Sequence, residues 1–567
     1  GRGAVLRAES PRGPTWWAVP VAVFAVYWPC LFAGLVYDDW VNFDRNQPLR
    51  DGDWFALVTQ PYYGPDTTYW RPITSLLMGL AYQAGPCGVH LLAIVLHVLA
   101  AYAVAAIARQ LLGDARLALF AALLFALHPL QVESVAWASA LPGVPSGLFL
   151  LLATRSVSSW ANGSGRRLPW SAAAWLSCCL LAKESGVVAL PLLAIVVSTA
   201  GGSRPRSAKF AVVGAVALVG AAWFAVHAAM VGWRPVLGDD GPWIAGAAQM
   251  TVRAVVLLFW PWPLTPFRAH PHAIGSASLD VVAVVVVAAG AVAAIVAWRR
   301  LAVRWRIAGA LAVLPLLLSA VTYDAVGPHP LTDRYLYSAV GGFALLVTAS
   351  IGRHFVALAT LVAVCGASAF VQCHVWQDDS TFVAHVLELT PGDQSVHVLA
   401  GTNALRAGDA TGLRRARCEF RAAIHLQPRV LDAFDRRQLA AALAGLAWCE
   451  VIDSDRGADR ARCALAGRFR QALELDPLYV PAWVGLGVAR GMSGQFEAAL
   501  DAFARALAID PLCPEAWFNL GRTQVDMGRR ADARHSLRRA LQCAPGLAAA
   551  AALMNELDVH DVAAARR

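Results

Sequence analysis

Charged side chains are scarce in this sequence, and lysine is almost missing. Only 15% of the 567 residues are charged, whereas 58% are hydrophobic. A chain this apolar cannot be one soluble domain, and it is too long for one domain of ordinary size. The composition therefore predicts a polytopic membrane protein with a further region attached.

Two lysines, Lys183 and Lys209, stand among 47 basic residues. Lys209 lies in a basic loop of the cytoplasmic type, so topology explains its charge. Lys183 lies between two apolar runs, in Leu-Ala-Lys-Glu-Ser at 181 to 185. A charge at that place in a membrane protein indicates a functional role.

Metal-binding and nucleic-acid-binding patterns are also missing. The eleven cysteines show no Cys-x-x-Cys spacing, which argues against zinc and thioredoxin-like sites. The stretch His270-Pro271-His272 has no third ligand nearby in the sequence, so we interpret it as an ordinary loop. The net charge of +9 comes from short loops and C-terminal helices without interleaved aromatic motifs. Nucleic acid is therefore not an expected partner.

Eleven apolar runs approach the length of about 20 residues that crosses a bilayer. Arginines between alternate runs place the N-terminus in the cytoplasm and the region after the last run outside. The run Val252–Trp262 is interpreted as re-entrant or surface-lying on the outer face, since a full span there would move the cluster Arg299–Arg306 outside. The predicted spans are 15–36, 89–108, 115–128, 135–157, 168–182, 186–200, 209–231, 279–298, 306–322, 335–351 and 355–375. The predicted domains are 1–376 in the membrane and 377–567 outside.

Six polar motifs fall on the predicted outer side. They are Asp38-Asp39, Tyr69-Trp70-Arg71-Pro72, His128-Pro129 with Glu133, Lys183-Glu184, Arg234, and Asp333-Arg334. Chance would scatter such motifs over both faces. Their shared side predicts a functional cavity at the outer membrane surface.

Four of the motifs also have a purely structural interpretation. The Asp38-Asp39 pair could end a helix in water, and His128 could cap a helix end. Lys183-Glu184 could be a local ion pair at a loop, and Asp333-Arg334 could be a salt bridge that fixes a loop. The shared side of the motifs, more than any one of them, favours a function.

Carboxylates, arginines and a lysine in one outer cavity suit a reaction on a polyprenyl-phosphate-linked sugar. Cationic groups would neutralise the phosphate leaving group as its charge develops. An aspartate, Asp38 or Asp39, would accept the proton of the attacking hydroxyl, with Asp39 slightly favoured. The candidates for binding the donor phosphate or sugar are Arg71, Glu133, Lys183, Glu184, Arg234, Asp333 and Arg334.

No metal ligand set and no certain cofactor can be assigned from spacing. A divalent cation held by Asp38, Asp39 and Glu133 is a chemical alternative, because hard cations prefer carboxylate oxygens.

The region after 377 repeats with a period of 34 residues. Asp476-Pro477 recurs as Asp510-Pro511, and Trp483 recurs as Trp517. This period, with its small-residue pattern, is the tetratricopeptide signature, and stacked units of this kind form a groove for a peptide or protein. The expected acceptor-binding residues are Trp483, Trp517 and Asn519.

The motifs together resemble a known family. They are Tyr-Asp-Asp-Trp at 37 to 40, Tyr-Trp-Arg-Pro-Ile at 69 to 73, His-Pro-Leu-Gln-Val-Glu-Ser-Val-Ala-Trp at 128 to 137, Leu-Ala-Lys-Glu at 181 to 184, Leu-Phe-Trp-Pro at 258 to 261 and Asp-Arg-Tyr-Leu-Tyr at 333 to 337. In this order, followed by repeats, they resemble the transmembrane and tetratricopeptide-repeat (TMTC) O-mannosyltransferases and their bacterial relatives. The resemblance spans nearly the whole chain. It implies the GT-C glycosyltransferase fold, a polyprenyl-phosphate sugar donor, an aspartate base from the first outer loop and inverting transfer.

One departure from the family pattern bears on function. Bacterial members tend to carry a charged cluster of the Glu-Arg-Lys-Asp kind after the tryptophan that matches Trp137, whereas this chain has Ala140-Leu141-Pro142-Gly143. If that cluster binds donor or acceptor in the relatives, this chain binds differently or is inactive. The short repeat array also leaves the acceptor open.

The sequence thus predicts an all-α protein, a GT-C-type membrane bundle followed by a tetratricopeptide-repeat solenoid. Its expected function is transfer of a mannose-like sugar from a polyprenyl-phosphate donor to a protein or envelope acceptor held by the repeats. The expected location is the bacterial inner membrane, with the repeats in the periplasm or otherwise outside the cytoplasm. The rival hypothesis is a non-catalytic, membrane-anchored scaffold whose repeats assemble envelope proteins.

Overall fold

The computed structural model describes residues 16–44, 46–62, 69–163, 168–199, 204–232, 243–268, 277–323, 329, 331–427, 433–453 and 459–565. Every regular element in this part of the chain is a helix. The chain divides into two compact units, 1–382 and 383–567. The division falls inside helix α18 (Asp379–Leu389).

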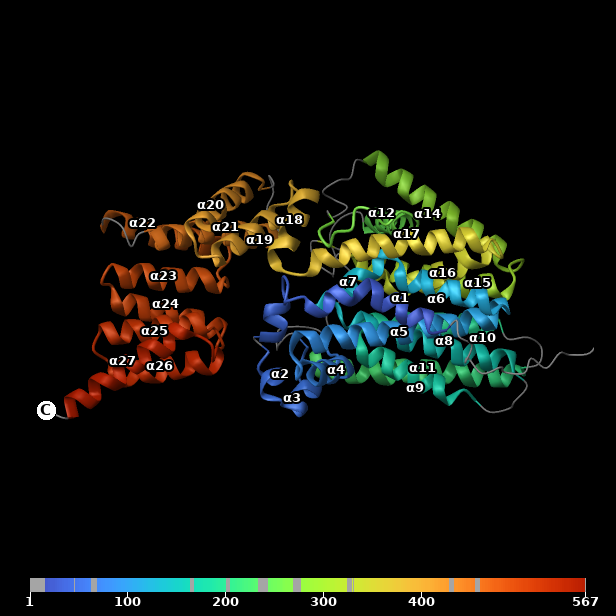
Figure 1. Cartoon of the computed structure of the whole chain (residues 1–567), viewed down its shortest axis with the longest axis horizontal. Helices are drawn as coiled ribbons and strands as arrows, with labels where there is room; N and C mark the ends of the chain where they lie inside the picture. The colour runs from blue at the N-terminus through green and yellow to red at the C-terminus, as the bar shows by residue number, and fades with distance from the viewer. Residues whose placement is uncertain are drawn as a thin grey trace, which may run out of the picture. The chain divides into compact units, whose positions relative to one another are not determined.

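The first unit is a bundle of helices, most of which run side by side, as Figure 1 shows. In chain order they are α1 (Ala18–Tyr27), α4 (Pro72–Tyr82), α5 (Gly85–Leu112), α6 (Ala115–Leu127), α7 (Val132–Ala136), α8 (Gly143–Asn162), α9 (Trp170–Ala182), α10 (Ala189–Ser198), α11 (Arg206–Val231), α12 (Trp243–Phe259), α14 (Ala277–Trp298), α15 (Val303–Val321), α16 (Tyr337–Ile351) and α17 (Phe355–Cys373). Short helices α2 (Gln47–Asp51) and α3 (Trp54–Thr59) lie in the first loop.

Seven helical segments in the described part are long and apolar enough to cross a membrane. An eighth results if α6 and the segment Pro129–Ala136 count as one span bent by 54°. The count of eleven is therefore not reached by length and composition. Three of the predicted spans, 15–36, 168–182 and 186–200, correspond to the shorter apolar helices Ala18–Phe32, Trp170–Ala182 and Glu184–Ser198.

The break between α6 and α7 has a local cause. Pro129 has no backbone N–H and disfavours a helical conformation at the residue before it, so α6 ends at Leu127. His128 has extended backbone and accepts a hydrogen bond from the Leu130 N–H at its side chain, 3.4 Å away. The prediction that His128 caps a helix end is confirmed, and the polar motif that follows it is turned into the protein interior.

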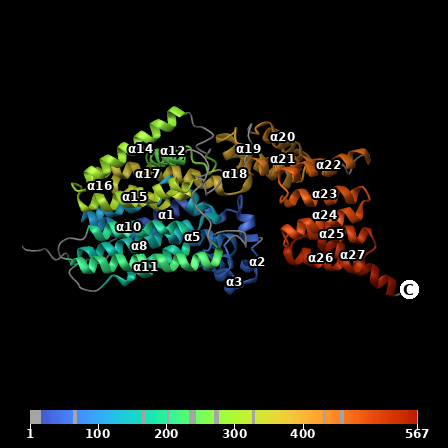
Figure 2. The same ribbon diagram turned by 180° about the vertical axis from the view of Figure 1, so that it is seen from behind.

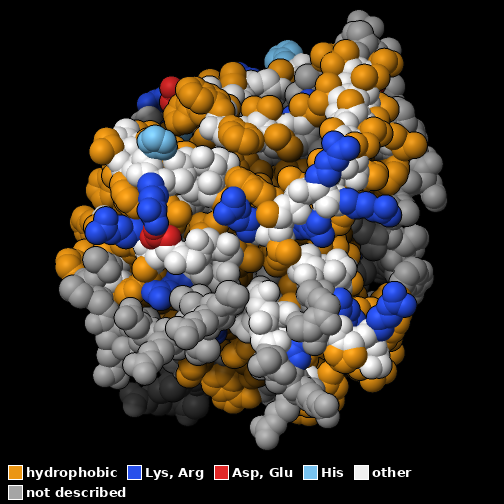
Figure 3. Space-filling view, turned by 90° about the vertical axis from the view of Figure 1, so that its right-hand side faces the viewer, with side chains coloured by type: hydrophobic (Ala, Val, Ile, Leu, Met, Phe, Trp, Pro, Cys, Tyr) orange, Lys and Arg blue, Asp and Glu red, His pale blue; other side chains and the backbone are white. Residues whose placement is uncertain are grey.

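One end of the bundle gathers lysine and arginine side chains among hydrophobic ones, as Figure 3 shows. Basic residues in the described part stand near helix ends joined by short connections: Arg109, Arg116, Arg204, Arg206, Lys209, Arg299, Arg300, Arg304, Arg306 and Arg353. Asp114, in the α5–α6 turn, lies 3.5 Å from Arg353, in the α16–α17 turn. These two turns therefore lie at the same end of the bundle.

The second unit is a stack of helix pairs, which Figure 2 shows from behind. Its helices are α19 (Gln394–Arg406), α20 (Ala410–His425), α21 (Ala433–Asp453), α22 (Asp459–Leu475), α23 (Val480–Met492), α24 (Phe496–Ile509), α25 (Pro514–Asp526), α26 (Arg530–Cys543) and α27 (Ala548–Ala565). Phe503 of α24 packs so closely on α23 that a Cβ at Gly487 would clash with its ring. Glycine is therefore favoured at that repeat position.

Candidate active site

The charged motifs predicted to share one cavity form one cluster in the first unit. Its members come from the loop after Phe32, the start of α4, the segment from α7 to α8, the α9–α10 junction and the short helix Asp333–Leu336. Backbone and side-chain hydrogen bonds join these segments across 97 to 201 positions of sequence. The cluster is therefore a product of the tertiary fold.

Asp39 is buried and fully hydrogen-bonded. Its side chain is 1% exposed. One carboxylate oxygen accepts from the Ser139 N–H at 2.8 Å and from the Ser139 hydroxyl, and the other accepts from the Val36 N–H at 3.0 Å. Asn42 donates to the same hydroxyl at 2.8 Å. Burial raises the pKa of Asp39 to about 7, although the bonds from Ser139 and Val36 act to lower it. Asp39 thus ties the first loop to the segment before α8.

Asp38 has a different environment. Its Oδ1 is buried and accepts no hydrogen bond from any described residue. Burial raises the pKa of Asp38 to about 6, and the positive charge of Arg334 works in the opposite direction. A carboxylate oxygen without a donor, near a guanidinium, is available to accept a proton or a ligand hydroxyl.

Glu133 is 2% exposed and binds the segment that carries Arg334. Its Oε1 accepts from the Arg334 guanidinium at 2.5 Å, and its Oε2 accepts from the Asp333 N–H at 2.8 Å. Asp333 pairs instead with Arg268 at 2.7 Å. Asp333 and Arg334 therefore form salt bridges that fix their loop, each with a partner distant in sequence.

The Arg334 guanidinium contacts two aromatic rings. Its guanidinium carbon lies 4.8 Å from the ring centroids of both Trp137 and Tyr335. Cation–π contacts of this kind, together with the Glu133 pair, fix the position of the charge.

Glu184 and Arg71 form a second ion pair. The Arg71 Nε lies 2.8 Å from Glu184, and the Trp70 N–H donates to the other carboxylate oxygen at 3.0 Å. The guanidinium of Arg71 also stacks on Tyr69, 4.5 Å from its ring centroid. The glutamate therefore attaches the start of α4 to the α9–α10 junction. The interpretation of Lys183-Glu184 as a local pair is wrong.

Lys183 keeps its ammonium available. Among the described residues its recorded contact is the ring of Tyr335, 5.3 Å from Nζ, and no carboxylate there pairs with it. Burial, with the positive charges of Arg71 and Arg334, lowers the pKa of Lys183 to about 7, while Glu184 and Glu133 act in the other direction. Three cationic side chains thus influence one another here, and an anion would relieve their repulsion.

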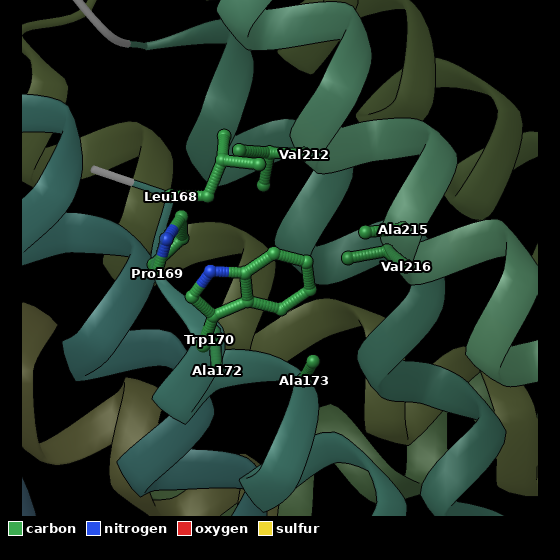
Figure 4. Close-up of a pocket in the computed structure, with 8 residues that line it drawn as sticks. All are labelled: Leu168, Pro169, Trp170, Ala172, Ala173, Val212, Ala215 and Val216. Atoms are coloured by element: carbon green, nitrogen blue, oxygen red, sulfur yellow. The ribbon is translucent and has the colours of Figure 1, made fainter. Parts of the chain in front are cut away.

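The remaining predicted site residues lie elsewhere or outside the described residues. Arg234 and the stretch His270-Pro271-His272 lie outside them. The Nε2 of His128 lies 3.1 Å from the Leu258 carbonyl, so this ring joins α12 to the bundle. A small apolar pocket is lined by Leu168, Pro169, Trp170, Ala172, Ala173, Val212, Ala215 and Val216, and Figure 4 shows it between α9 and α11. Its lining contains no ionisable side chain and is separate from the charged cluster.

The carboxylates do not fit a divalent cation. Both oxygens of Glu133 bond to the segment 333–334, and both oxygens of Asp39 accept protein hydrogen bonds. In the part of the chain that the structure describes, no three His, Cys, Asp or Glu side chains are grouped to hold a metal ion. A cation held by Asp38, Asp39 and Glu133 therefore does not fit this arrangement of oxygens.

In the repeats, the predicted acceptor-binding tryptophans have a shared structural contact. The Trp483 indole donates to the Pro477 carbonyl at 2.8 Å, and the Trp517 indole donates to the Pro511 carbonyl at 2.9 Å. Asn519 donates to the Glu515 carbonyl of its own helix at 2.8 Å. These bonds engage the polar groups named as acceptor contacts, so the groove role of the three residues stays a prediction.

Sequence reasoning missed Ser139, Asn42 and Asp379. Ser139 follows Trp137 closely, but a serine among alanines gives no signal of its own. Asp379 accepts from the Tyr37 N–H at 2.7 Å and from the Trp40 indole at 3.1 Å. Asp379 follows the last apolar run, so the predicted domain boundary at 377 assigned it to the repeats and not to the site.

Comparisons with known proteins agree with both parts of the resemblance. Two models described as tetratricopeptide repeat match residues 466–511 and 492–557. A thermophilic tetratricopeptide-repeat protein of Thermus thermophilus superposes with a TM-score of 0.26 at 19% identity, over 35% of this chain and 95% of that one. That score is too low to establish a shared fold.

Curated relatives match part of the chain. The protein O-mannosyl-transferase tmtc2 of Xenopus laevis is 31% identical over 185 residues, 30% of this chain and 22% of the relative. The human TMTC2 is 29% identical over 186 residues, with the same two shares. The Drosophila melanogaster Tmtc1 is 35% identical over 128 residues, 20% of this chain and 14% of the relative. The chain thus spans less than a quarter of each of these relatives. It is a distant, partial homologue of TMTC protein O-mannosyltransferases with several long apolar helices and tetratricopeptide repeats.

Proposed function

We propose that this protein is a membrane glycosyltransferase of the GT-C type that moves a mannose-like sugar from a polyprenyl-phosphate donor to a hydroxyl of a protein or peptide. The observation that carries the proposal is the free carboxylate oxygen of Asp38 beside Arg334, with Lys183 and Arg71 in the same cluster. The similarity to O-mannosyltransferases supports the choice of sugar and acceptor.

The base is assigned to Asp38 rather than to the initially favoured Asp39. Both carboxylate oxygens of Asp39 already accept hydrogen bonds within the protein, one from Val36 and one from Ser139. Asp38 has a free oxygen and, with a pKa of about 6, is largely ionised at neutral pH. A catalytic base is most effective when its pKa lies near the working pH.

The reaction is a single displacement. The acceptor hydroxyl oxygen bonds to the anomeric carbon as the bond from that carbon to the phosphate oxygen breaks, and the hydroxyl proton passes to Asp38. The leaving polyprenyl phosphate gains negative charge, which Lys183 and Arg334 stabilise. Glu133 has both oxygens engaged by Arg334 and Asp333, so it orients Arg334 and does not attack the sugar. One displacement without an enzyme nucleophile inverts the anomeric configuration.

The location proposed for the site is the outer face of a bacterial inner membrane, with the repeats on the same side. The basic turns gather at one end of the bundle (Figure 3), and positive loops favour the cytoplasm. The acceptor would be presented by the groove of the repeats, since stacked tetratricopeptide units commonly bind peptides there.

The test is sugar release from polyprenyl-phosphate mannose in proteoliposomes. Asp38→Asn should lower transfer by about 10² to 10⁴-fold with an unchanged melting temperature, because it removes the base without a volume change. Asp39→Asn should also lower the melting temperature. Asparagine replaces one carboxylate oxygen by an NH₂ group, which would then face a backbone N–H, either that of Val36 or that of Ser139. Equal transfer by Asp38→Asn and wild type would overturn the assignment of the base.

A scaffold without catalysis is the second candidate, and one observation favours it. Ala140, Leu141 and Gly143 are buried where bacterial relatives tend to carry charges. If the wild-type protein released no sugar from polyprenyl-phosphate donors while its repeats still bound envelope proteins, this candidate would be preferred.

A further inference from the structure

The residue before Asp38 has an unusual backbone conformation. Tyr37 has a φ of 62°, and no other non-glycine residue in the described ranges has a positive φ. This left-handed conformation is unfavourable for a residue with a Cβ, because the Cβ approaches the following carbonyl oxygen. It persists when surrounding contacts determine it, and such residues cluster at functional sites.

A single carboxylate binds both ends of this turn. The Oδ1 of Asp379 accepts from the Tyr37 N–H at 2.7 Å, and its Oδ2 accepts from the Trp40 indole at 3.1 Å. Asp38 lies between these two donors in the sequence. The backbone N–H of Gly34 also donates to the Gln377 carbonyl at 3.0 Å, so three hydrogen bonds attach the loop to residues 377–379.

The Tyr37 ring adds packing contacts to these bonds. Its centroid lies 5.8 Å from Trp137, 5.6 Å from Phe267 and 5.8 Å from Phe382. Trp137 is also the ring on which Arg334 stacks. The same indole therefore contacts both the Tyr37 ring of the loop and the Arg334 guanidinium.

The hydrogen bonds of Asp39 fix the other side of the turn. Val36 and Ser139 donate to Asp39, while Tyr37 and Trp40 donate to Asp379. Within residues 36–40, Asp38 is thus the side chain left with an oxygen that no described residue occupies.

We propose that Asp379 is a positioning residue that holds the left-handed turn at Tyr37 and so directs the Asp38 carboxylate toward Arg334. The inference rests on the proposed function of Asp38 as the base. Asp379 touches neither sugar nor phosphate in this scheme. It acts on the turn through the Tyr37 N–H and the Trp40 indole.

The test compares Asp379→Asn with Asp378→Asn in full-length protein. Asparagine at 379 has one oxygen and one NH₂ group. Its NH₂ group would face either the Tyr37 N–H or the Trp40 indole, so one of the two hydrogen bonds that hold the turn would be lost. Asp378 instead caps α18, accepting from the Thr381 N–H at 2.9 Å, and asparagine caps equally well. We expect Asp379→Asn to lower kcat by about 10 to 100-fold with little change in donor KM, as small misplacements of a reacting group do. Asp378→Asn should match the wild type.

Two further readouts separate positioning from general damage. Hydrogen exchange at the Tyr37 amide should become faster in Asp379→Asn, whether or not the protein is active. Trp40→Phe, which removes one of the two donors, should show a smaller loss of kcat. An unchanged kcat and an unchanged Tyr37 exchange rate in Asp379→Asn would overturn the proposal. Absence of transfer by the wild type would instead reject the proposed function, and the exchange measurement alone would then decide whether Asp379 holds the turn.

Discussion

Adjacent aspartates have opposite tasks in this site because adjacent side chains point differently. Asp39 joins the loop to Ser139, whereas Asp38 retains a free oxygen beside Arg334. The residue before the pair, Tyr37, has a left-handed backbone with a φ of 62°, and we infer that this turn directs the two carboxylates differently. In the proposed reaction, this turn leaves Asp38 as the carboxylate that accepts the proton of the acceptor hydroxyl.

The pH dependence of transfer should be bell-shaped. Asp38 must be ionised to act as a base, so kcat/KM should rise as pH increases through its pKa of about 6. Lys183 must be protonated to bind phosphate, so kcat/KM should fall as pH increases above its pKa of about 7. Initial rates at low donor concentration in proteoliposomes between about pH 5 and 9, a range that brackets both groups, would measure the curve. A rate that only rises over this range would contradict the role of Lys183.

Lys183 offers a direct test of phosphate binding. Lys183→Met should raise the donor KM by about 10 to 100-fold, because a hydrogen bond to a charged group contributes about 1.5 to 3 kcal/mol. In Lys183→Met, the fall of kcat/KM at high pH should also disappear. The matched control is Lys209→Met at the start of α11, which changes the other lysine of the chain. A KM unchanged in Lys183→Met would show that the arginines alone hold the phosphate.

The charged residues of the cluster could be named from the sequence, but their partners could not. The predicted spans placed several charged motifs on the same side of the membrane. Among them were Tyr-Asp-Asp-Trp, Leu-Ala-Lys-Glu and Asp-Arg-Tyr-Leu-Tyr. The pairs themselves, Glu184 with Arg71 and Arg334 with Glu133, join residues 113 and 201 positions apart. A local pattern cannot contain such information, because the tertiary fold sets these distances.

At the scale of helices, the lengths of the apolar runs predicted the positions of many helices. They predicted the number of membrane spans less well. The segments 168–182 and 186–200 were predicted as two spans, and they correspond to two shorter apolar helices on either side of Lys183. Helices α3 and α4 were missed because runs of 6 and 11 residues are too short to register as spans. The polar break at Lys183 is itself part of the site.

Helix packing provides a stability test away from the charges. A Cβ on Gly342 of α16 would lie 2.6 Å from the Ala308 carbonyl oxygen of α15 and would clash with the Ala312 nitrogen. Gly342→Ala should therefore separate α15 from α16 and lower stability by about 1 to 3 kcal/mol, the usual cost of overpacking. The control Gly309→Ala lies on α15 with no described atom within 4 Å of its Cβ. Melting temperatures in detergent, measured by tryptophan fluorescence, should fall for Gly342→Ala alone.

At the scale of the whole molecule, different kinds of sequence signal predict the two units. The 34-residue repeat is a periodic signal, so the stack of α23 to α26 followed from spacing alone. The bundle has no such period, and its site depends on the order in which distant motifs meet. This difference explains why the repeats were predicted in detail while the contacts of the charged cluster were not.

Sidedness is the prediction on which the shared cavity depends. The basic turns, including Arg299, Arg300 and Arg353, are expected in the cytoplasm, because positively charged short loops are retained there. Residues after Trp376, and with them Asp379 and the repeats, are then expected outside. Paired reporter fusions, one active only in the cytoplasm and one only outside, would be placed after Trp376 and after Arg300. The fusion after Trp376 should show the outer reporter's activity, and the fusion after Arg300 should show the cytoplasmic one's. Cytoplasmic activity after Trp376 would place the Asp38 loop, which Asp379 binds, on the cytoplasmic side and would remove the argument for an outward-facing donor site.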